Sequence, residues 1–248
     1  PITLPATGTY TLLIDPTGEQ TGSVKLTAYA FEDLSGSFSS IEDQQKISIP
    51  VPGQVARYTV SATAGQKVAL RTLESAYSGE YKVEWFDPAG KSLKWDWWQP
   101  AGNKFWEPVK FPATGTYTLL IDPWRGHTGS VSVDLWEASD VTGQTITPSV
   151  EGGSVTSTIK VIGQQELITF SGSKDQRFSL LIAEGTFGGA VTLYSPSGSQ
   201  VTSETFAKGE KAFREPITLP ATGTYTLLID PTGEQTGSVK PTASAFDG

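Results

Sequence analysis

The sequence contains no cysteine and no methionine, and it has one histidine and a single asparagine, Asn103. The lack of cysteine excludes disulfides, thiolate metal sites and a cysteine nucleophile. Asn103 is followed by Lys and Phe, so it is not a glycosylation acceptor. Without methionine the chain as written does not begin at a start codon, and we interpret it as a mature product or an excised part. Few basic residues, many Thr, Ser and Gly, and no oxidisable sulfur favour an extracellular or cell-surface bacterial β protein.

Long apolar runs are missing as well. No stretch approaches the roughly 18 apolar residues that a membrane-spanning helix needs, and no secretory leader is recognisable, so we expect no membrane insertion. The chain carries 26 acidic and 18 basic residues, which gives a formal net charge of −8. A phosphate backbone would be repelled by this charge, so we expect no nucleic-acid partner.

Motifs for catalysis and metal binding are also scarce. The only histidine, His127, lies in the turn WRGHTG, where the other copies of a repeat carry Gln20 and Gln235. No Gly-x-Ser-x-Gly elbow accompanies it, and this favours a solvated turn residue over a Ser–His–Asp arrangement. HExxH, cysteine-cluster and DxDxDG patterns are missing. We therefore predict a non-enzyme with no catalytic residues and no cofactor, and leave open only a calcium ion at a module junction.

What the sequence does have is an internal repeat. Residues 1–25 recur letter for letter at 216–240, and 1–33 differs from 216–248 only at residues 26, 29, 32 and 33. A further copy begins at Pro108, so the starts give a period of about 107 residues. We predict three parts: 1–36 is the C-terminal third of a β-sandwich module, 37–141 is a complete, tryptophan-rich module, and 142–248 is a second complete module.

The pentapeptide LPATG at 4–8 and 219–223, with FPATG at 111–115, matches the LPxTG signal that sortases cleave. It is repeated, however, and each copy continues into TYTLLIDP. Proline ends a preceding strand, and glycine adopts backbone conformations that other residues resist. We therefore predict a strand–turn–strand corner at each copy.

Alternating apolar residues predict the fold class. TYTLLID places Tyr117, Leu119 and Ile121 on one face of a strand, which is typical of an antiparallel sheet with one buried side. In the middle copy, strands are expected near 46–50, 55–61, 66–73, 80–86, 91–98, 104–110, 116–122 and 129–136. This pattern predicts an all-β fold of tandem antiparallel β-sandwich modules, jelly-roll or immunoglobulin-like, with the first module partial.

The stretches LPATGTYTLLIDPTGEQTGSVKLTAYAF and DVTGQTITPSVEGGSVT (140–156) resemble tandem modules of very large secreted bacterial proteins. Such modules occur beside RHS/YD repeats and are similar to pre-peptidase C-terminal β-sandwiches. The resemblance covers nearly the whole chain, module by module. It implies an extracellular spacer, adhesive or binding module, and the middle copy departs from it in its tryptophans.

All 7 tryptophans lie in the middle copy. Trp85 and Trp98 align with Leu193 and Phe206, which predicts that both belong to the core. The other five align with polar or small residues (Ser203, Thr205, Arg214, Thr232 and Ser244). We therefore predict that these five face solvent and form a ligand- or partner-binding site: Trp95, Trp97, Trp106, Trp124 and Trp136.

Three interpretations of these tryptophans stay open. Trp95 and Trp97 are two residues apart on one strand, so their rings point to the same side. With Trp106 and Trp124 they could stack on sugar rings while Lys94, Asp96 and Gln99 bind hydroxyls. Alternatively the rings pack against a neighbouring module or another chain, or they fill the core of a variant module.

Residues 1–36 favour protein contact. They hold about three predicted strands, which is too few for a stable sandwich. Their apolar assembly face (Tyr10, Leu12, Ile14 and Val24) must be covered by upstream sequence or by a neighbouring chain. We therefore predict a structural repeat of a fibre, stalk or adhesin, whose partners are other copies or adjacent modules. The alternatives are a carbohydrate-binding module with a polysaccharide partner and an accessory domain of a secreted hydrolase. Since Pro241 replaces Leu26, we also expect the last strand to be interrupted or to lie at an edge.

Overall fold

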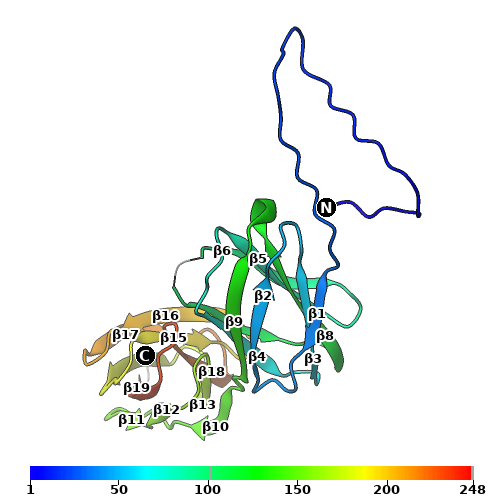
Figure 1. Ribbon diagram of the computed structural model, residues 1–248. Helices are drawn as coiled ribbons and strands as arrows, with labels where there is room; N and C mark the ends of the chain where they lie inside the picture. The colour runs from blue at the N-terminus through cyan, green and yellow to red at the C-terminus, as the bar shows by residue number, and fades with distance from the viewer. Residues whose placement is uncertain (101, 247–248) are drawn as a thin grey trace.

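A computed structural model describes residues 1–100 and 102–246 of the chain (Figure 1). From Leu34 onward these residues form two β-sandwiches in succession, each built from two sheets. The helical content of the described residues is one short 3-10 turn, η1 (Trp124–Gly126). The predicted all-β fold of tandem sandwiches is confirmed.

The first sandwich packs a five-stranded sheet, ordered β1-β3-β8-β5-β6, against a four-stranded sheet, ordered β2-β9-β4-β7. Eight of its strands lie where the alternating pattern predicts them, and β1 precedes these. The bounds are β1 (Leu34–Ser37), β2 (Gln44–Ile49), β3 (Ala56–Ala62), β4 (Lys67–Leu73), β5 (Tyr81–Phe86), β6 (Ser92–Trp98), β7 (Lys104–Lys110), β8 (Gly115–Pro123) and β9 (Gly129–Glu137).

The second sandwich repeats this plan. One sheet is ordered β10-β13-β18-β15-β16 and the other β11-β19-β14-β17, with β12 also paired to β19. Only the first strand of each sandwich, β1 or β10, pairs in parallel with its neighbour among the named strands. The bounds are β10 (Val141–Thr145), β11 (Gly153–Ser154), β12 (Ser157–Ile159), β13 (Glu166–Gly172), β14 (Arg177–Ala183), β15 (Gly189–Tyr194), β16 (Gln200–Phe206), β17 (Ala212–Thr218), β18 (Gly223–Pro231) and β19 (Gly237–Phe246).

Each sandwich has its own hydrophobic core. The inward positions of β8, Tyr117, Leu119 and Ile121, are fully buried between the two sheets, as the alternation predicts. The same three positions of β18 are Tyr225, Leu227 and Ile229, and they are buried in the second core. The tandem cores therefore follow from the repeated period-two pattern.

The LPATG-type pentapeptide forms the predicted corner, and it carries the chain from one sheet to the other. In the second sandwich the corner joins β17 to β18, and the Tyr225 hydroxyl donates to the carbonyl of Ala221 at 2.7 Å. The Ala221 amide donates to the same hydroxyl at 3.1 Å. Gly223 has φ +151°, and a Cβ there would lie 2.8 Å from Pro196, so the motif needs its glycine for close packing.

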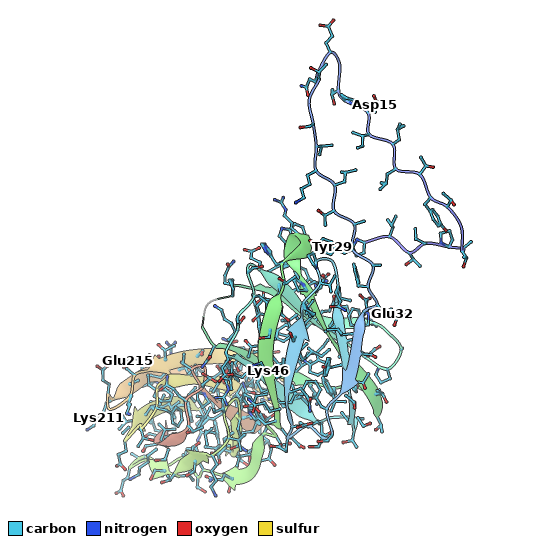
Figure 2. The ribbon with its side chains drawn as sticks, in the orientation of Figure 1. Asp15, Tyr29, Glu32, Lys46, Lys211 and Glu215 are labelled. Carbon is cyan, nitrogen blue, oxygen red and sulfur yellow. The ribbon has the colours of Figure 1, made fainter. Side chains whose placement is uncertain are left out.

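Residues 1–33 form no strand, so the prediction of strands in this segment is wrong for the single chain. The segment leaves the first sandwich as an extended loop, and Figure 2 shows Asp15 far from both sandwiches. The predicted assembly face is 49–79% exposed, whereas its counterparts in β18 and β19 are at most 1% exposed. The physical reason is that strands need neighbours for their backbone hydrogen bonds, and the chain offers this segment none. The face comprises Tyr10, Leu12, Ile14 and Val24.

The expectation for Pro241 is also wrong. Strand β19 continues through this proline and lies inside its sheet, between β14 and the short strands β11 and β12. Pro241 is tolerated because no residue of the named strands pairs with it on the outer side of β19. It faces the gap between two short strands, which separates Ser154 at the end of β11 from Ser157 at the start of β12. The carbonyl of Pro241 still accepts the Val155 amide at 3.3 Å.

Candidate functional site

Three of the five predicted tryptophans lie exposed on the outer face of the first sandwich. On the edge strand β6, Trp95 is opposite Glu84 and Trp97 is opposite Lys82, while Trp124 begins η1. The three side chains are 55%, 38% and 45% exposed, respectively. The rings of Trp97 and Trp124 meet edge to face, with centroids 5.1 Å apart. We call Trp95, Trp97 and Trp124 the tryptophan surface.

Charged side chains lie among these indoles. The Lys82 ammonium is 5.2 Å from the centre of the Trp95 ring and 2.5 Å from a Glu84 carboxylate oxygen. Burial acts to raise the pKa of Glu84, but its hydrogen bonds from Lys82 and Ser92 bring that pKa below the ordinary value. Burial raises the pKa of Asp122, which lies opposite Lys82 on β8. The surface therefore combines flat apolar rings with a paired cation.

Trp85 and Trp98 are buried in the core, as predicted, but Trp106 is buried too. The prediction that Trp106 faces solvent is wrong: its side chain is 6% exposed and packs 5.5 Å from Trp98. The alignment with Arg214 misled because an arginine at an inward position can extend its guanidinium outward, here towards Glu204 at 4.0 Å. Trp106 therefore cannot belong to a sugar-stacking surface.

Trp136 lies where the two sandwiches meet. Its indole Nε1 donates to the carbonyl of Ile162, in the loop before β13, at 2.8 Å. The Phe105 ring stacks on it at 5.9 Å, and the Arg71 guanidinium lies 5.3 Å from its centre. Arg71 also reaches the second sandwich directly through Glu234 at 3.3 Å. Trp136 is thus an anchor between modules, as one of the interpretations proposed.

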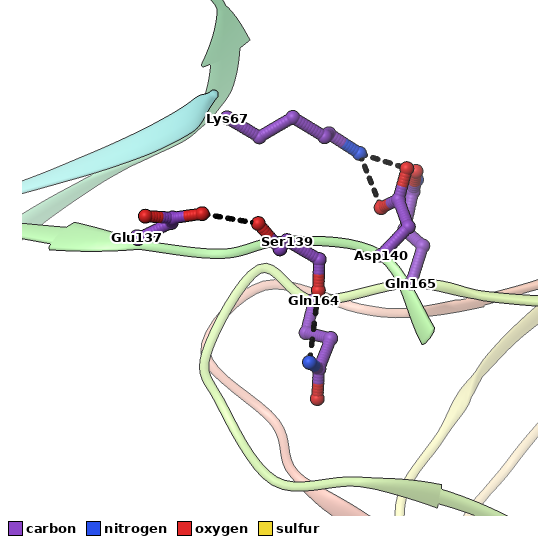
Figure 3. A network of polar contacts seen from close by, with 6 residues as sticks. All are labelled: Lys67, Glu137, Ser139, Asp140, Gln164 and Gln165. Carbon is purple, nitrogen blue, oxygen red and sulfur yellow. Dashed lines mark hydrogen bonds and ion pairs between the residues drawn. The ribbon is translucent and has the colours of Figure 1, made fainter. Parts of the chain in front are cut away.

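Polar contacts complete this junction, which we define as the contacts between the first sandwich and the residues from Asp140 onward (Figure 3). The Lys67 ammonium lies 2.6 Å from Asp140 and 3.0 Å from the side-chain oxygen of Gln165. The Gln164 side chain donates to the Ser139 carbonyl at 2.9 Å. No group of three or more His, Asp or Glu that could hold a metal gathers within the described residues.

A cavity of about 530 Å³ lies beside the junction. Lys67, Glu107 and Pro108 line it from the first sandwich, and Ala190, Thr205 and Thr232 are among the residues that line it from the second. Burial, and then the charge of Asp230 across the junction, raises the pKa of Glu107. The two sandwiches therefore approach closely here without filling the space between them.

The entrance to the first sandwich repeats the hydrogen bonds of the entrance to the second. Gln54 donates to the Glu32 carbonyl at 2.6 Å, as Gln164 donates to Ser139. The amide of Leu34 donates to Val55 at 2.8 Å. The amide of Val141 donates to Gln165 at the same distance in the second sandwich. The same local connection therefore precedes both sandwiches.

His127 stays a turn residue. Its Nδ1 lies 3.1 Å from the Ser78 hydroxyl, and the Thr128 amide also donates to that hydroxyl. In the described part of the chain no carboxylate hydrogen-bonds to the imidazole, so the third group that would orient a catalytic base is not provided there.

No family model matches the chain, and no curated protein matches its sequence. Among solved structures, it is similar to PliG of Aeromonas hydrophila, a periplasmic inhibitor of g-type lysozyme, at 18% identity and TM-score 0.32. That match covers 42% of this chain and 100% of the inhibitor. The pre-peptidase C-terminal domain of a Bacillus anthracis collagenase matches at 12% identity and TM-score 0.33, over 42% of this chain and 96% of that domain.

A larger structure, the M60 catalytic domain with two CBM51 domains of Clostridium perfringens ZmpB, matches at 6% identity and TM-score 0.27. That match covers 82% of this chain and 34% of the other. The described residues contain no helix long and apolar enough to cross a membrane. At this level of similarity, function has to be inferred from the residues of the chain itself, and the family resemblance stays a prediction.

Proposed function

We propose that this chain is a non-enzymatic structural repeat of an extracellular bacterial fibre, stalk or adhesin, in which sandwiches stack end to end. The observation that carries the proposal is the repeated entrance: Gln54 and Leu34 make the same backbone contacts before the first sandwich as Gln164 and Val141 make before the second. The first sandwich is therefore built to follow another module, just as the second sandwich follows the first.

The segment 1–33 supplies the last third of that preceding module. Its counterpart, residues 216–246, forms β18 and β19 in the second sandwich, where β18 lies between β13 and β15. A neighbouring copy offers the same partner strands in its residues 142–215 when its own residues 216–246 leave them. Strand complementation would then join one copy to the next, because residues 1–25 are identical to 216–240, which form the end of β17, all of β18 and the start of β19.

Self-association tests this function. We expect the purified chain to form linear oligomers as its concentration rises, in sedimentation velocity and negative-stain microscopy. Deletion of residues 1–33 should leave monomers. A parent chain that stays monomeric at every concentration would contradict the proposal.

A matched pair of variants separates strand insertion from a loose association. Leu12 corresponds to Leu227, which is buried, and Leu13 corresponds to Leu228, which is only half-buried. Leu12→Asp should abolish assembly, because the charge would enter the neighbour's core, whereas Leu13→Asp should reduce assembly far less. Equal effects of both variants would exclude insertion in the register of β18.

Carbohydrate binding is a second candidate, and the exposed rings of Trp95, Trp97 and Trp124 favour it. Flat exposed aromatic side chains offer apolar contact area to the faces of sugar rings. Pull-down on insoluble polysaccharides, with tryptophan fluorescence as a second readout, tests this candidate. Binding that is lost in the Trp95→Ala, Trp97→Ala double variant, in a chain that does not assemble, would replace the structural proposal.

A further inference from the structure

Two residues of the tryptophan surface, Trp97 and Trp124, occupy the positions that face the module junction in the second sandwich. Trp97 pairs with Lys82 across β5 and β6, at the same register position where Thr205 pairs with Ala190 across β15 and β16. The amide of Trp124 donates to Glu80 at 2.8 Å, and the amide of its counterpart Thr232 donates to Gly188 at 2.9 Å. The equivalence of Trp97 and Trp124 to Thr205 and Thr232 therefore rests on strand register and backbone hydrogen bonds as well as on sequence alignment.

In the second sandwich this position is next to a hollow. Ala190, Thr205 and Thr232 are small, and they line the cavity of about 530 Å³ whose other wall is the end of the first sandwich. The first sandwich carries large side chains at the same three positions: Lys82, Trp97 and Trp124. If another module docked here in the same way, the large side chains would bury apolar area. They would also fill the space that is left empty at the internal junction.

Residues 1–33 mark the end of the first sandwich at which a preceding module would lie. Gly163 lies against Pro108 of the first sandwich, because a Cβ added there would be 2.7 Å from that ring. Its counterpart Gly53 lies against Phe31 and Pro1, at 3.2 and 3.8 Å by the same measure. Pro1 corresponds to Pro108 in the repeat. Figure 1 shows η1, which contains Trp124, at this same end and away from the second sandwich.

The second sandwich carries a matching free end. Phe213 occupies on β17 the position of Phe105 on β7, opposite Leu181 as Phe105 is opposite Arg71. Phe105 is stacked at the junction, whereas Phe213 is 52% exposed. Glu215 corresponds to the junction residue Glu107, and Figure 2 shows it on the second sandwich, away from the N-terminal segment.

Charge also favours this pairing. At the internal junction Glu107 lies near Asp230, and the cations that act on it, Lys94 and Lys67, both belong to the first sandwich, whereas the second sandwich offers Ala190. On the tryptophan surface the position of Ala190 is Lys82, which adds a cation where Glu215 of a neighbour would lie. Opposite charges at this point lower the electrostatic cost of the contact.

We propose that Trp97 and Trp124, with Lys82, are the docking face for the C-terminal end of a second copy. In the geometry of the internal junction, Glu215 of that copy meets this face, as Glu107 meets Ala190, Thr205 and Thr232, and its Phe213 lies against Gly53, as Phe105 lies against Gly163. This inference rests on the proposed end-to-end stacking and names its contact surface. Between two copies, the two indoles fill the space that is equivalent to the hollow between the sandwiches of one chain.

The test replaces both indoles by the residues of the second sandwich, in the full-length chain. Trp97→Thr with Trp124→Thr should weaken self-association by at least about tenfold in sedimentation velocity and leave the thermal midpoint of the first sandwich nearly unchanged. Trp95→Ser is the matched control, because Ser203 replaces Trp95 in the second sandwich and does not line the cavity. Its assembly should equal that of the parent chain.

The outcomes separate this inference from the proposed function. Assembly that is lost on deletion of residues 1–33 but unchanged in the double Thr variant overturns the docking face and leaves the stacking proposal standing. A parent that never assembles overturns both. Polysaccharide binding that disappears in the double Thr variant, without any change in assembly, assigns the rings to sugar and also overturns the docking face.

A reciprocal variant tests the cavity-filling step without any assembly. Thr205→Trp with Thr232→Trp places the same rings beside the internal cavity, so the two sandwiches should unfold at closer temperatures than in the parent chain. The double variant Ser203→Trp, Thr192→Trp adds rings outside the cavity lining and serves as the control. A cavity-directed variant that leaves the two unfolding transitions as they are, or separates them further, contradicts the proposal.

Discussion

Residues 1–25 and 216–240 are identical in sequence, yet they differ in structure. The second copy forms the end of β17, the whole of β18 and the start of β19 in a closed sandwich, whereas the first forms no strand and lies exposed. Leu227 is fully buried while its equivalent Leu12 is 79% exposed. A β-strand therefore depends on its neighbours: the alternating pattern specifies which face becomes buried, but partner strands must supply the hydrogen bonds and the covering side chains.

One feature is common to both copies. The Ala6 amide donates to the Tyr10 hydroxyl at 3.2 Å, and that hydroxyl donates back to the Ala6 carbonyl, as Tyr225 does with Ala221. The hydrogen bonds of the PATGTY corner join residues that are only four apart in sequence, so the chain forms it without a partner. Local hydrogen bonds therefore form the corner in both settings, whereas the long-range strand pairing exists in only one.

The largest effect should come from removing one copy or the other. Deletion of 216–246 together with 1–33 should unfold the second sandwich, because β18 and β19 lie inside its two sheets. Deletion of 1–33 alone should leave both sandwiches folded. Near-ultraviolet circular dichroism and proton–nitrogen correlation spectra measure this difference.

A third variant sharpens the same comparison. Deletion of 216–246 alone leaves the positions of β18 and β19 vacant in the second sandwich of each chain. The segment 1–33 of another chain can occupy these positions. We expect polymers with a folded second sandwich, which size-exclusion chromatography with light scattering would detect. Monomers with an unfolded second sandwich would mean that the two copies of the segment are not interchangeable.

The same substitution in the two copies should have different costs. Leu227→Ala should lower the free energy of unfolding by about 2–5 kcal/mol, because it leaves a cavity in a packed core. Leu12→Ala should change the stability of the monomer by almost nothing, since Leu12 is exposed. Urea denaturation of both variants at low protein concentration measures the difference, and equal destabilisation would show that residues 1–33 are packed.

The corner tyrosines provide a smaller effect. Tyr225→Phe removes a hydroxyl that bonds to both the amide and the carbonyl of Ala221, so we expect a loss of about 1 kcal/mol. Tyr10→Phe should cost far less in a thermal unfolding experiment, because the groups that it leaves unpaired are open to water. A similar cost at both positions would contradict the view that burial sets the value of this bond.

The smallest effect concerns the differences between the two copies. Segment 1–33 carries Leu26 and Tyr29 where 216–248 carries Pro241 and Ser244. Ser244→Tyr should stabilise the second sandwich by about 0.5–1 kcal/mol, because the new ring can stack on Phe213 as Trp136 stacks on Phe105. Ser244→Ala is the control, and an equal gain from both variants would exclude stacking as the cause.

The tryptophans show how far alignment within the chain can be used to predict a site. Trp95, Trp97 and Trp124 face solvent where the sibling residues are small and polar, as predicted. The same rule failed for Trp106, because the sibling Arg214 occupies an inward position and only its guanidinium reaches outward. Whether a position is buried depends on how the sheets pack. An aligned arginine does not indicate this, because its aliphatic stem can be buried while its charged group reaches solvent.

The sequence by itself determined the repeat, the all-β class, the positions of the strands in the first sandwich and the PATG corners, because these depend on period-two alternation and on contacts within a few residues. Only the tertiary structure decided which copy of an identical segment becomes a sheet, since pairing requires strands that lie far away in the chain. It also decided that Trp136 anchors the junction, that Trp106 belongs to the core, and that Trp97 and Trp124 occupy the face equivalent to a hollow junction. Those outcomes follow from how separate elements pack, and no local pattern encodes them.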